Sequence, residues 1–360
     1  MSIHFHKLVV KEIRKETPEC VSVLFAIPEE LKEDFIFKQG QSLTMRTFFN
    51  GEEVRRTYSI CGSPLDAEWR VAIKKQEGGL FSGFANSQLK QGDILEVMPP
   101  VGKFYTDLGP QQKKNYVAFA AGSGITPVIS IIKTTLRTEP KSQFTLVYGN
   151  RNKNSIIFKE ELEGLKDRYI DRFRIIHILS RERTDAPINS GRINLNKLNE
   201  LTKLISYENA DEFFICGPEE MIFCVKDFLE NEKIKKNKIH FELFTTPGEN
   251  QKSKVKSQKS ETKEEGPTSI ISVKLDGITF DFELGLNAEP ILDAALKHGA
   301  DLPFSCKGGV CCTCKAKLIE GEVDMVVHWG LEHEEIEQGY ILTCQSHPKT
   351  NRVIIDFDIK

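Results

Sequence analysis

The sequence predicts a multidomain protein of mixed α+β and α/β class, in which an antiparallel β-barrel, an α/β domain and a smaller third domain follow one another. Three features of the 360-residue chain indicate this order: short alternating apolar runs before residue 109, strands that alternate with helices up to residue 246, and a polar segment after it. A chain of this length is too long for one ordinary hydrophobic core. We therefore expect domains over 1–108, 109–246 and 269–360, with a flexible linker over 247–268.

The first domain is expected to consist of short strands. Five runs of alternating character are separated by turns rich in Gly, Pro and Asp: 7–12, 20–26, 41–48, 71–75 and 93–98. Short strands at this regular spacing are typical of an antiparallel barrel.

The pattern changes after Pro110. An apolar strand over 116–120 leads through Ala121-Gly122-Ser123-Gly124 into a helix over 127–136. Further strands are expected over 144–148, 173–179 and 212–216, with a helix over 159–166. Strands that alternate with helices predict a parallel sheet.

The segment 247–268 has one aliphatic residue, Val255, and cannot bury enough apolar surface to offset the entropy cost of ordering. It is expected to be a mobile linker. The domain that follows has expected strands over 270–275, 279–283 and 353–357, and a helix over 291–298.

Charge is distributed unevenly along the chain. The net formal charge is −3, but residues 269–360 contain eight Lys or Arg against fifteen Asp or Glu, a net of −7, and residues 1–246 carry +3. An acidic domain on a mildly basic body suggests electrostatic docking onto a basic partner, and the alternative is an effect on solubility alone. No basic patch indicates binding to nucleic acid.

No apolar run approaches the length of about 18 residues that a membrane helix needs, and the N-terminal residues lack the apolar stretch of a signal peptide. Five of the nine cysteines are scattered without a pairing pattern: Cys20, Cys61, Cys216, Cys224 and Cys312. Such a remainder fits reduced thiols, so we expect a cytoplasmic protein without a membrane partner.

The other four cysteines carry the most specific signal. Cys306, Cys311 and Cys314 follow a C-x4-C-x2-C pattern, and Cys344 comes after 29 further residues. This is the plant-type ligand pattern of a [2Fe–2S] cluster. Gly308 and Gly309 lie inside the loop, where glycine allows the backbone to approach the cluster sulfides.

Two motifs in the first domain indicate a flavin site. In Arg56-Thr57-Tyr58-Ser59, the guanidinium suits phosphate oxygens, the tyrosine offers a flat face to a flavin ring, and the serine can bond near flavin N5. Gly78-Gly79-Leu80-Phe81-Ser82 leads into an expected helix over 82–89, whose free N–H groups can bind a pyrophosphate. A pyrophosphate site predicts FAD as the flavin.

The second domain carries a nicotinamide-type pattern. Gly122, Ser123, Gly124 and Thr126 lie in a strand-to-helix turn where a dinucleotide's phosphates can approach the backbone. Pro127 occupies the third glycine position of the usual fingerprint, so an ordinary turn is the alternative. Cys216-Gly217-Pro218 ends another strand at the same edge of the sheet.

Ser180 and Arg181 follow the strand that ends at Leu179, where an arginine can hold the 2′-phosphate of NADPH. Arg192 can assist. We expect NADPH to be preferred, although the neighbouring Glu182 leaves NADH possible.

In this order, R-x-Y-S, G-G-x-x-S, A-G-S-G-I-T-P and C-G-P resemble the ferredoxin–NADP reductase superfamily. The resemblance implies a flavin-binding barrel, a Rossmann-like nicotinamide domain, and Cys216 beside the nicotinamide. It also implies a closing strand over 240–244, in which Glu242 positions nicotinamide or relays protons and Phe244 covers the flavin ring. The third domain resembles plant-type ferredoxins, which have a β-grasp fold.

The domain order resembles the reductase components of multicomponent oxygenases. Ser180-Arg181-Glu182 and the stretch from Trp329-Gly330-Leu331-Glu332 to Gly339-Tyr340 most resemble the reductase subunits of phenylacetyl-CoA epoxidases in phenylacetate degradation. The resemblance implies that electrons pass from NADPH to FAD, to the [2Fe–2S] cluster and then to an oxygenase partner. Three alternatives stay open at this point: the reductase of another oxygenase or hydroxylase, a self-contained NADPH-dependent reductase of a small acceptor, and a redox sensor without turnover.

Overall fold

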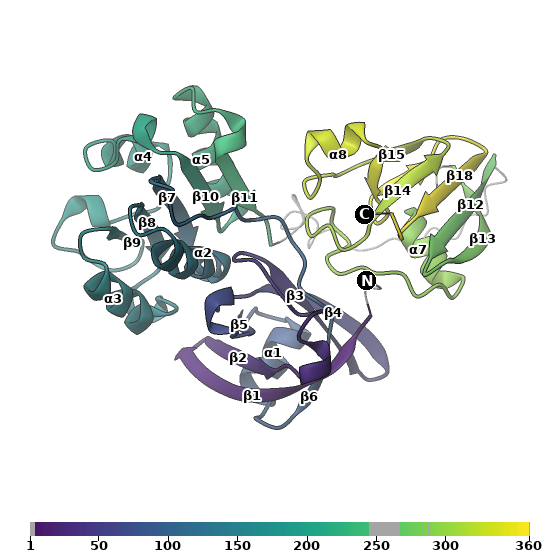
Figure 1. Cartoon of the computed structure of the whole chain (residues 1–360), viewed down its shortest axis with the longest axis horizontal. Coiled ribbons are helices and arrows are strands. Elements are labelled where there is room, and N and C mark those ends of the chain that lie inside the picture. The colour runs from purple at the N-terminus through teal and green to yellow at the C-terminus, as the bar shows by residue number, and fades with distance from the viewer. Residues whose placement is uncertain (1–3, 245–266, 287, 360) are drawn as a thin grey trace. The chain divides into compact units, whose positions relative to one another are not determined.

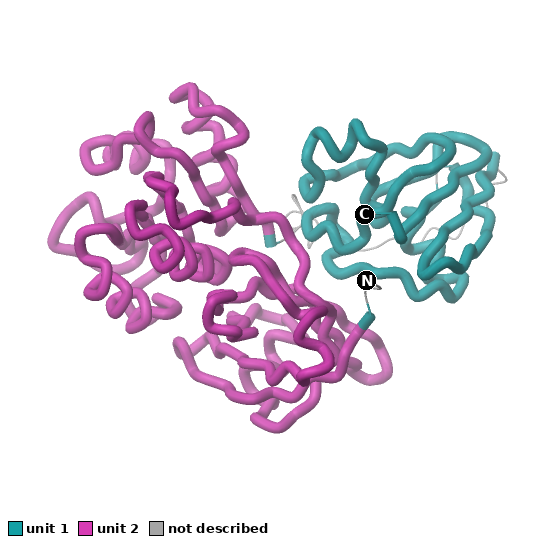
Figure 2. Tube along the Cα trace, in the orientation of Figure 1, with its two compact units in different colours: residues 1–4, 244–360 teal, residues 5–243 magenta. Residues whose placement is uncertain are grey.

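The computed structural model describes residues 4–244, 267–286 and 288–359 (Figure 1). The chain divides into two compact units, one of residues 5–243 and one of residues 1–4 with 244–360 (Figure 2). Residues 247–266 of the predicted linker lie outside the described residues, and the predicted domain boundaries stay predictions.

The first part of the larger unit is a six-stranded antiparallel sheet with the strand order β4-β3-β6-β1-β2-β5. Its strands are β1 (His6–Thr17), β2 (Cys20–Ala26), β3 (Ser42–Phe49), β4 (Glu52–Ser59), β5 (Arg70–Lys74) and β6 (Ile94–Val97). Helix α1 (Leu80–Ser87) follows β5. The inward-facing side chains form one core that includes Leu8, Phe25, Leu43 and Phe81.

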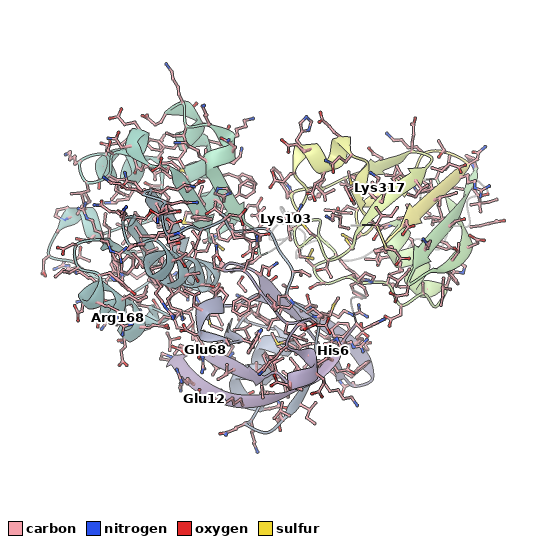
Figure 3. The ribbon with its side chains drawn as sticks, viewed as in Figure 1. His6, Glu12, Glu68, Lys103, Arg168 and Lys317 are labelled. Atoms are coloured by element: carbon pink, nitrogen blue, oxygen red, sulfur yellow. The ribbon has the colours of Figure 1, made fainter. Side chains whose placement is uncertain are left out.

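Two strands of this sheet differ from the sequence prediction. β1 continues to Thr17 instead of ending at residue 12, because register shifts after Val10 and Lys15 interrupt the apolar alternation without ending the strand. β4 is absent from the expected runs because four of its first five residues are charged. At the start of β5, the buried Arg70 binds the carboxylates of Glu68 at 2.8 Å and Glu12 at 2.6 Å (both acids are labelled in Figure 3).

The second part is a five-stranded parallel sheet with the order β11-β10-β7-β8-β9. Its strands are β7 (Asn115–Ala121), β8 (Gln143–Asn150), β9 (Phe173–Leu179), β10 (Glu212–Cys216) and β11 (Ile239–Glu242). The helices are α2 (Ile125–Thr138), α3 (Lys159–Arg168), α4 (Leu195–Leu201) and α5 (Glu219–Asn231). The parallel sheet agrees with the alternation of strands and helices in the sequence.

Helix α2 also ties this domain to the barrel. The Ser130 hydroxyl donates to the Gly62 carbonyl at 2.6 Å, and Ser63 and Thr134 share a hydrogen bond of 2.9 Å. All four residues are buried, so these bonds are shielded from water. These bonds therefore help to join the barrel and the parallel-sheet domain into one compact unit.

The smaller unit is built on a five-stranded sheet with the order β13-β12-β18-β14-β16, in which β12 and β18 run parallel, plus a β15-β17 pair. Its strands are β12 (Thr268–Leu275), β13 (Ile278–Gly285), β14 (Lys315–Glu320), β15 (Val323–Met325), β16 (Tyr340–Leu342), β17 (Ser346–Pro348) and β18 (Arg352–Asp356). Helices α7 (Ile291–Lys297) and α8 (His333–Glu337) complete it. The predicted fold class agrees with all three sheets, and no described helix has the length and apolarity that crossing a membrane requires.

Candidate redox site

The predicted flavin motif lies at the end of β4. Arg56 is exposed, and the ring of Tyr58 lies against Phe81 of α1 with centroids 5.7 Å apart and a tilt of 33°. Burial raises the pKa of the Tyr58 hydroxyl, so the group stays neutral. Thr57 shares a hydrogen bond of 3.0 Å with Thr44 on β3, which fixes the strand pair beneath the motif.

The glycine pair before α1 forms a tight turn that leads into the helix. Gly78 has φ +71°, and a Cβ on Gly79 would lie 2.5 Å from the Ser82 hydroxyl. That hydroxyl accepts from Gln76 N at 3.0 Å and donates to the Gly79 carbonyl at 3.3 Å. Ser82 therefore closes the turn, and α1 begins at Leu80, two residues before the expected start. The first N–H groups of α1 remain available to an anion.

Ser59, Cys216 and Glu242 come together from three strands. The Ser59 hydroxyl donates to Glu242 Oε2 at 3.1 Å, although the two residues are 183 positions apart. Cys216 pairs with Glu242 across the β10–β11 ladder. Burial raises the pKa of Glu242 to about 7, with the Ser59 hydrogen bond opposing. Burial also raises the pKa of the Cys216 thiol well above its usual value, and Glu242 adds to that shift.

The nicotinamide-type turn is packed too closely for any side chain at its third residue. Gly122–Gly124 forms a short 3-10 turn before α2, which begins at Ile125. A Cβ on Gly124 would lie 2.0 Å from the carbonyl oxygen of Cys216. Thr126 donates to the Ser123 carbonyl at 3.0 Å and stabilises the turn. The two predicted glycine motifs are thus held against each other.

The Cys216-Gly217-Pro218 motif packs against the end of β7 from the other side of this contact. A Cβ on Gly217 would lie 2.7 Å from Met221 Cε and 3.2 Å from Ala121 N. Pro218 precedes the first residue of α5 and directs the chain into that helix. The strand ends at Ala121 and Cys216 therefore meet at one edge of the sheet, where parallel sheets bind ligands.

Lys74, the last residue of β5, was not among the predicted site residues. Its Nζ lies 3.7 Å from the position that a Cβ on Gly122 would take, which places a cation beside the turn. The hydroxyl of Tyr148, on the neighbouring strand β8, donates to the Gly122 carbonyl at 3.0 Å. The only feature in the sequence that could have indicated Lys74 as a site residue is its position shortly before the Gly78-Gly79 pair. Its nearness to Gly122 depends on how the barrel packs against the parallel-sheet domain.

Beyond β9, the exposed side chains of Arg181 and Arg192 lie near the carboxyl edge of the sheet, together with Ser180. Arg181 N donates to the Arg151 carbonyl at 2.8 Å, and Ser180 N donates to the Asn150 carbonyl at 3.0 Å. These bonds hold the segment beside the end of β8.

The carboxylate of Glu182 is bonded to Lys153. Its Oε2 accepts from the Lys153 backbone N–H at 2.7 Å, and its Oε1 lies 3.5 Å from Lys153 Nζ. A carboxylate held in this way is less able to accept from a ribose hydroxyl, which favours the arginine side of the predicted nucleotide preference.

The four cysteines with the plant-type spacing converge. The thiols of Cys311 and Cys344 lie beside Cys306 and lower its pKa, and Cys344 also lies beside Cys314. Within the described residues, no three His, Cys, Asp or Glu side chains surround a single metal-ion position. Four cysteine thiolates with this spacing are the ligand set of a plant-type [2Fe–2S] cluster.

The loop that carries these thiols is closely supported. A Cβ on Gly309, which has φ +75°, would lie 2.6 Å from the Val327 carbonyl oxygen. Gly308 N donates to Cys306 Sγ at 3.3 Å, so backbone N–H groups already point at a ligand sulfur. The Cys312 thiol donates to the Gly330 carbonyl and so points to the neighbouring segment. These contacts fit a [2Fe–2S] group bound within the loop.

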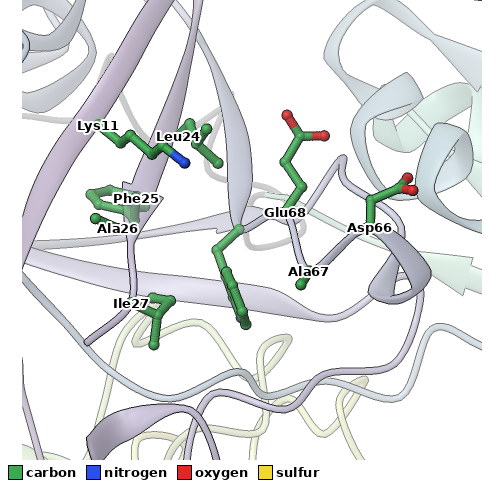
Figure 4. Close-up of a pocket in the computed structure, with 9 residues that line it drawn as sticks. Lys11, Leu24, Phe25, Ala26, Ile27, Asp66, Ala67 and Glu68 are labelled. Atoms are coloured by element: carbon green, nitrogen blue, oxygen red, sulfur yellow. The ribbon is translucent and has the colours of Figure 1, made fainter. Parts of the chain in front are cut away.

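Two further features are Phe244 and a pocket on the barrel. Phe244, the predicted cover of the flavin ring, is 42% exposed and belongs to the smaller unit, so its role stays a prediction. An open pocket on the barrel is lined by Lys11 of β1, by the end of β2 with Ile27, and by residues 66–69 (Figure 4). None of the predicted site residues lines that pocket.

Comparison with known protein families matches three segments of the chain. Residues 7–105 match the oxidoreductase FAD-binding domain, 119–227 match the oxidoreductase NAD-binding domain, and 273–349 match the 2Fe-2S iron-sulfur cluster binding domain. The predictions of an oxidoreductase and of FAD, a nicotinamide nucleotide and a [2Fe–2S] cluster are therefore confirmed.

Among curated proteins, the chain is 44% identical to one of the subunits of 1,2-phenylacetyl-CoA epoxidase from Escherichia coli K12, over 99% of this chain and 98% of that protein. It is 31% identical to the ferredoxin reductase component of 3-ketosteroid-9-alpha-monooxygenase from Rhodococcus rhodochrous, over 97% and 96% of the two chains. The solved structure of phthalate dioxygenase reductase matches with a TM-score of 0.59 at 24% identity, over 98% of both chains, which shows the shared fold.

Proposed function

Because the chain belongs to the family of flavin and iron–sulfur reductases that supply electrons to multicomponent oxygenases, we propose that its partner is a phenylacetyl-CoA epoxidase. The observation that carries the proposal is identity of 44% to a component of that enzyme, sustained over 99% of the chain. We further propose that the protein acts in the cytoplasm, as part of phenylacetate degradation.

When bound, the nicotinamide supplies hydride, FAD converts two-electron into one-electron chemistry, and the cluster carries single electrons. The residues of the barrel bind the flavin and orient its ring. Arg56 and the N–H groups at the start of α1 hold phosphate oxygens, and Tyr58 provides the flat surface for a ring. Leu80 and Phe81 belong to the first turn of α1 and are part of the same proposed site.

Ser59, Cys216 and Glu242 form the proposed catalytic group. Glu242 has a pKa of about 7, so it is partly protonated at neutral pH and can hold or release a proton at Oε2 beside Ser59. Cys216 is fully buried and stays a neutral thiol, so it adds no charge beside Glu242 behind the proposed nicotinamide site.

Gly122, Ser123, Gly124 and Thr126 shape the turn that receives the nucleotide phosphates, and Gly217 and Pro218 form its opposite wall. Ser180, Arg181 and Arg192 are proposed to bind the 2′-phosphate, since Glu182 is already bonded to Lys153. NADPH is then the preferred donor.

The proposal is tested by reconstitution. The purified holoprotein and NADPH are combined with the oxygenase component of a phenylacetyl-CoA epoxidase, and oxygenated phenylacetyl-CoA is measured by mass spectrometry. We expect product that depends on every component. Background-level product, together with rapid reduction of ferricyanide, would reject this partner.

A second candidate rests on the ketosteroid relative, which is 31% identical over 97% of the chain. The same assay with the oxygenase component of a 3-ketosteroid-9-alpha-monooxygenase is the matched comparison. Higher coupling there than with the epoxidase would transfer the assignment to that system.

A further inference from the structure

The segment 326–330 of the smaller unit presents apolar side chains to solvent. Val326 is 66% exposed and Trp329 is 45% exposed, whereas Leu331 directly after it is buried at 8%. Exposed apolar side chains that gather in one place mark interaction surfaces, whereas isolated ones are ordinary.

Backbone hydrogen bonds hold this segment beside the cluster-binding loops. Gly330 N donates to the Gly309 carbonyl at 2.9 Å, and Val326 N donates to the Gln345 carbonyl at 3.1 Å. Gly309 lies between ligands Cys306 and Cys311, and Gln345 follows ligand Cys344. The segment is thus fastened at both ends, through its backbone, to the chain that carries the ligands.

Acidic side chains flank the apolar pair on both sides. Asp324 precedes it, and Glu332, Glu334 and Glu337 follow it, all of them exposed. The half-buried Lys315 nearby is engaged with Glu335 at 3.0 Å, and Lys349 lies 3.4 Å from Asp324 and offsets part of the charge on that side, so Glu332, Glu334 and Glu337 carry most of the rim's charge. An apolar centre with an acidic rim is complementary to an apolar recess bordered by Lys and Arg.

We propose that Val326 and Trp329 form an apolar anchor, with the flanking acids as its rim, through which the smaller unit docks on the oxygenase component. The inference rests on the proposed function, because the partner is the protein that receives the electrons. Docking at this segment brings the partner to the loops that carry the cluster, which keeps the path of electron transfer short.

The test uses full-length holoprotein with the variants Trp329→Ala and Val326→Ser. Ile278→Ser is the matched control, because Ile278 is 72% exposed but lies on β13, at the opposite edge of the five-stranded sheet from β16. The measured quantity is the oxygenase concentration that gives half-maximal NADPH-driven turnover. A parallel anaerobic measurement follows reduction of the cluster by NADPH alone.

We expect Trp329→Ala to raise the half-saturating concentration about tenfold, which is typical of an aromatic side chain at the centre of an interface. Val326→Ser should have a smaller effect, and Trp329→Phe should restore most of the loss. Reduction of the cluster by NADPH should be unchanged, as should all properties of Ile278→Ser.

The dependence on salt distinguishes the contribution of the apolar anchor from that of its acidic rim. The Trp329→Ala penalty should persist at high ionic strength, since apolar burial is not screened. An unchanged half-saturating concentration, an equal penalty for Ile278→Ser, or slower reduction of the cluster by NADPH would each overturn the proposal. Failure of the unaltered protein to support the oxygenase would instead reject the proposed function, and the anchor with it.

Discussion

At the scale of single residues, the site depends on pairs that are distant in the sequence. Ser59 and Glu242 were expected at the flavin separately, one from its motif and the other from the family resemblance, and the structure joins them at 3.1 Å. Lys74 was not expected, because no local pattern reports its distance of 3.7 Å from a Cβ position on Gly122. A short motif predicts which residues face a ligand, whereas contacts between domains follow from tertiary packing.

Glu242 gives a prediction for pH. Burial raises its pKa from 4.5 in the unfolded chain to about 7, so the folded protein binds more protons between these values and loses stability as pH rises through them. We expect Glu242→Gln to stabilise the holoprotein by about 1–2 kcal/mol at pH 8 and by much less at pH 5. Thermal unfolding at both pH values checks this, and an equal shift at the two would contradict it.

Arg181 gives a prediction for nucleotide choice. Arg181→Ala should weaken NADPH binding by about 1.5–3 kcal/mol, the scale of a hydrogen bond to a charged group, and leave NADH binding nearly unchanged. The matched control is Arg168→Ala, an exposed arginine at the end of α3 (labelled in Figure 3). Binding of both nucleotides is measured by flavin fluorescence. Equal losses for NADPH and NADH would remove Arg181 from the 2′-phosphate site.

At the scale of elements, strands were predicted best where turn residues bound an apolar run. The observed bounds of β9 (Phe173–Leu179) and β10 (Glu212–Cys216) coincide with those expected. β14 to β17 and α8 were not predicted, because these elements have only three to six residues and are too short to show a period. Their positions depend on the ligand loop and on the sheet that they join.

The turn before α2 makes a prediction at this scale. Gly124→Ala should destabilise the protein by about 1–3 kcal/mol and abolish tight nucleotide binding, because the new Cβ would lie 2.0 Å from the Cys216 carbonyl oxygen. Gly164→Ala in α3 is the control, since a Cβ there meets nothing within 4 Å. That change should be neutral or slightly stabilising. Chemical denaturation and NADPH titration measure both effects, and wild-type binding by Gly124→Ala would refute the close-packed turn.

At the scale of the whole molecule, the net charge of −7 on residues 269–360 suggests docking that weakens with salt. The structure shows which acidic residues can be reversed in charge to test this docking without damage to the fold. Glu332 and Glu335 cap α8 reciprocally, and Glu335 also binds Lys315, so reversing their charge would damage the fold. Glu322, Glu334 and Glu337 are exposed and better suited.

We expect the triple change of Glu322, Glu334 and Glu337 to Lys to weaken coupling to the oxygenase at low salt and to flatten its salt dependence. Flavin reduction by NADPH and ferricyanide reduction should stay at wild-type rates, because they need no docking of this face. Turnover is measured from low to high ionic strength. Coupling that matches the unaltered protein at every salt concentration would reduce the acidic face to a solvated surface.

The central claim is that one chain carries electrons from a hydride donor through FAD to a [2Fe–2S] cluster. Anaerobic titration with NADPH tests it most directly, with flavin and cluster followed by their absorbance. Two electrons for FAD and one for the cluster require about 1.5 equivalents of NADPH, and Cys311→Ser should lower this to about one while flavin is retained. Full bleaching of the flavin at about one equivalent, with the cluster of the unaltered protein still oxidised after excess NADPH, would contradict the account.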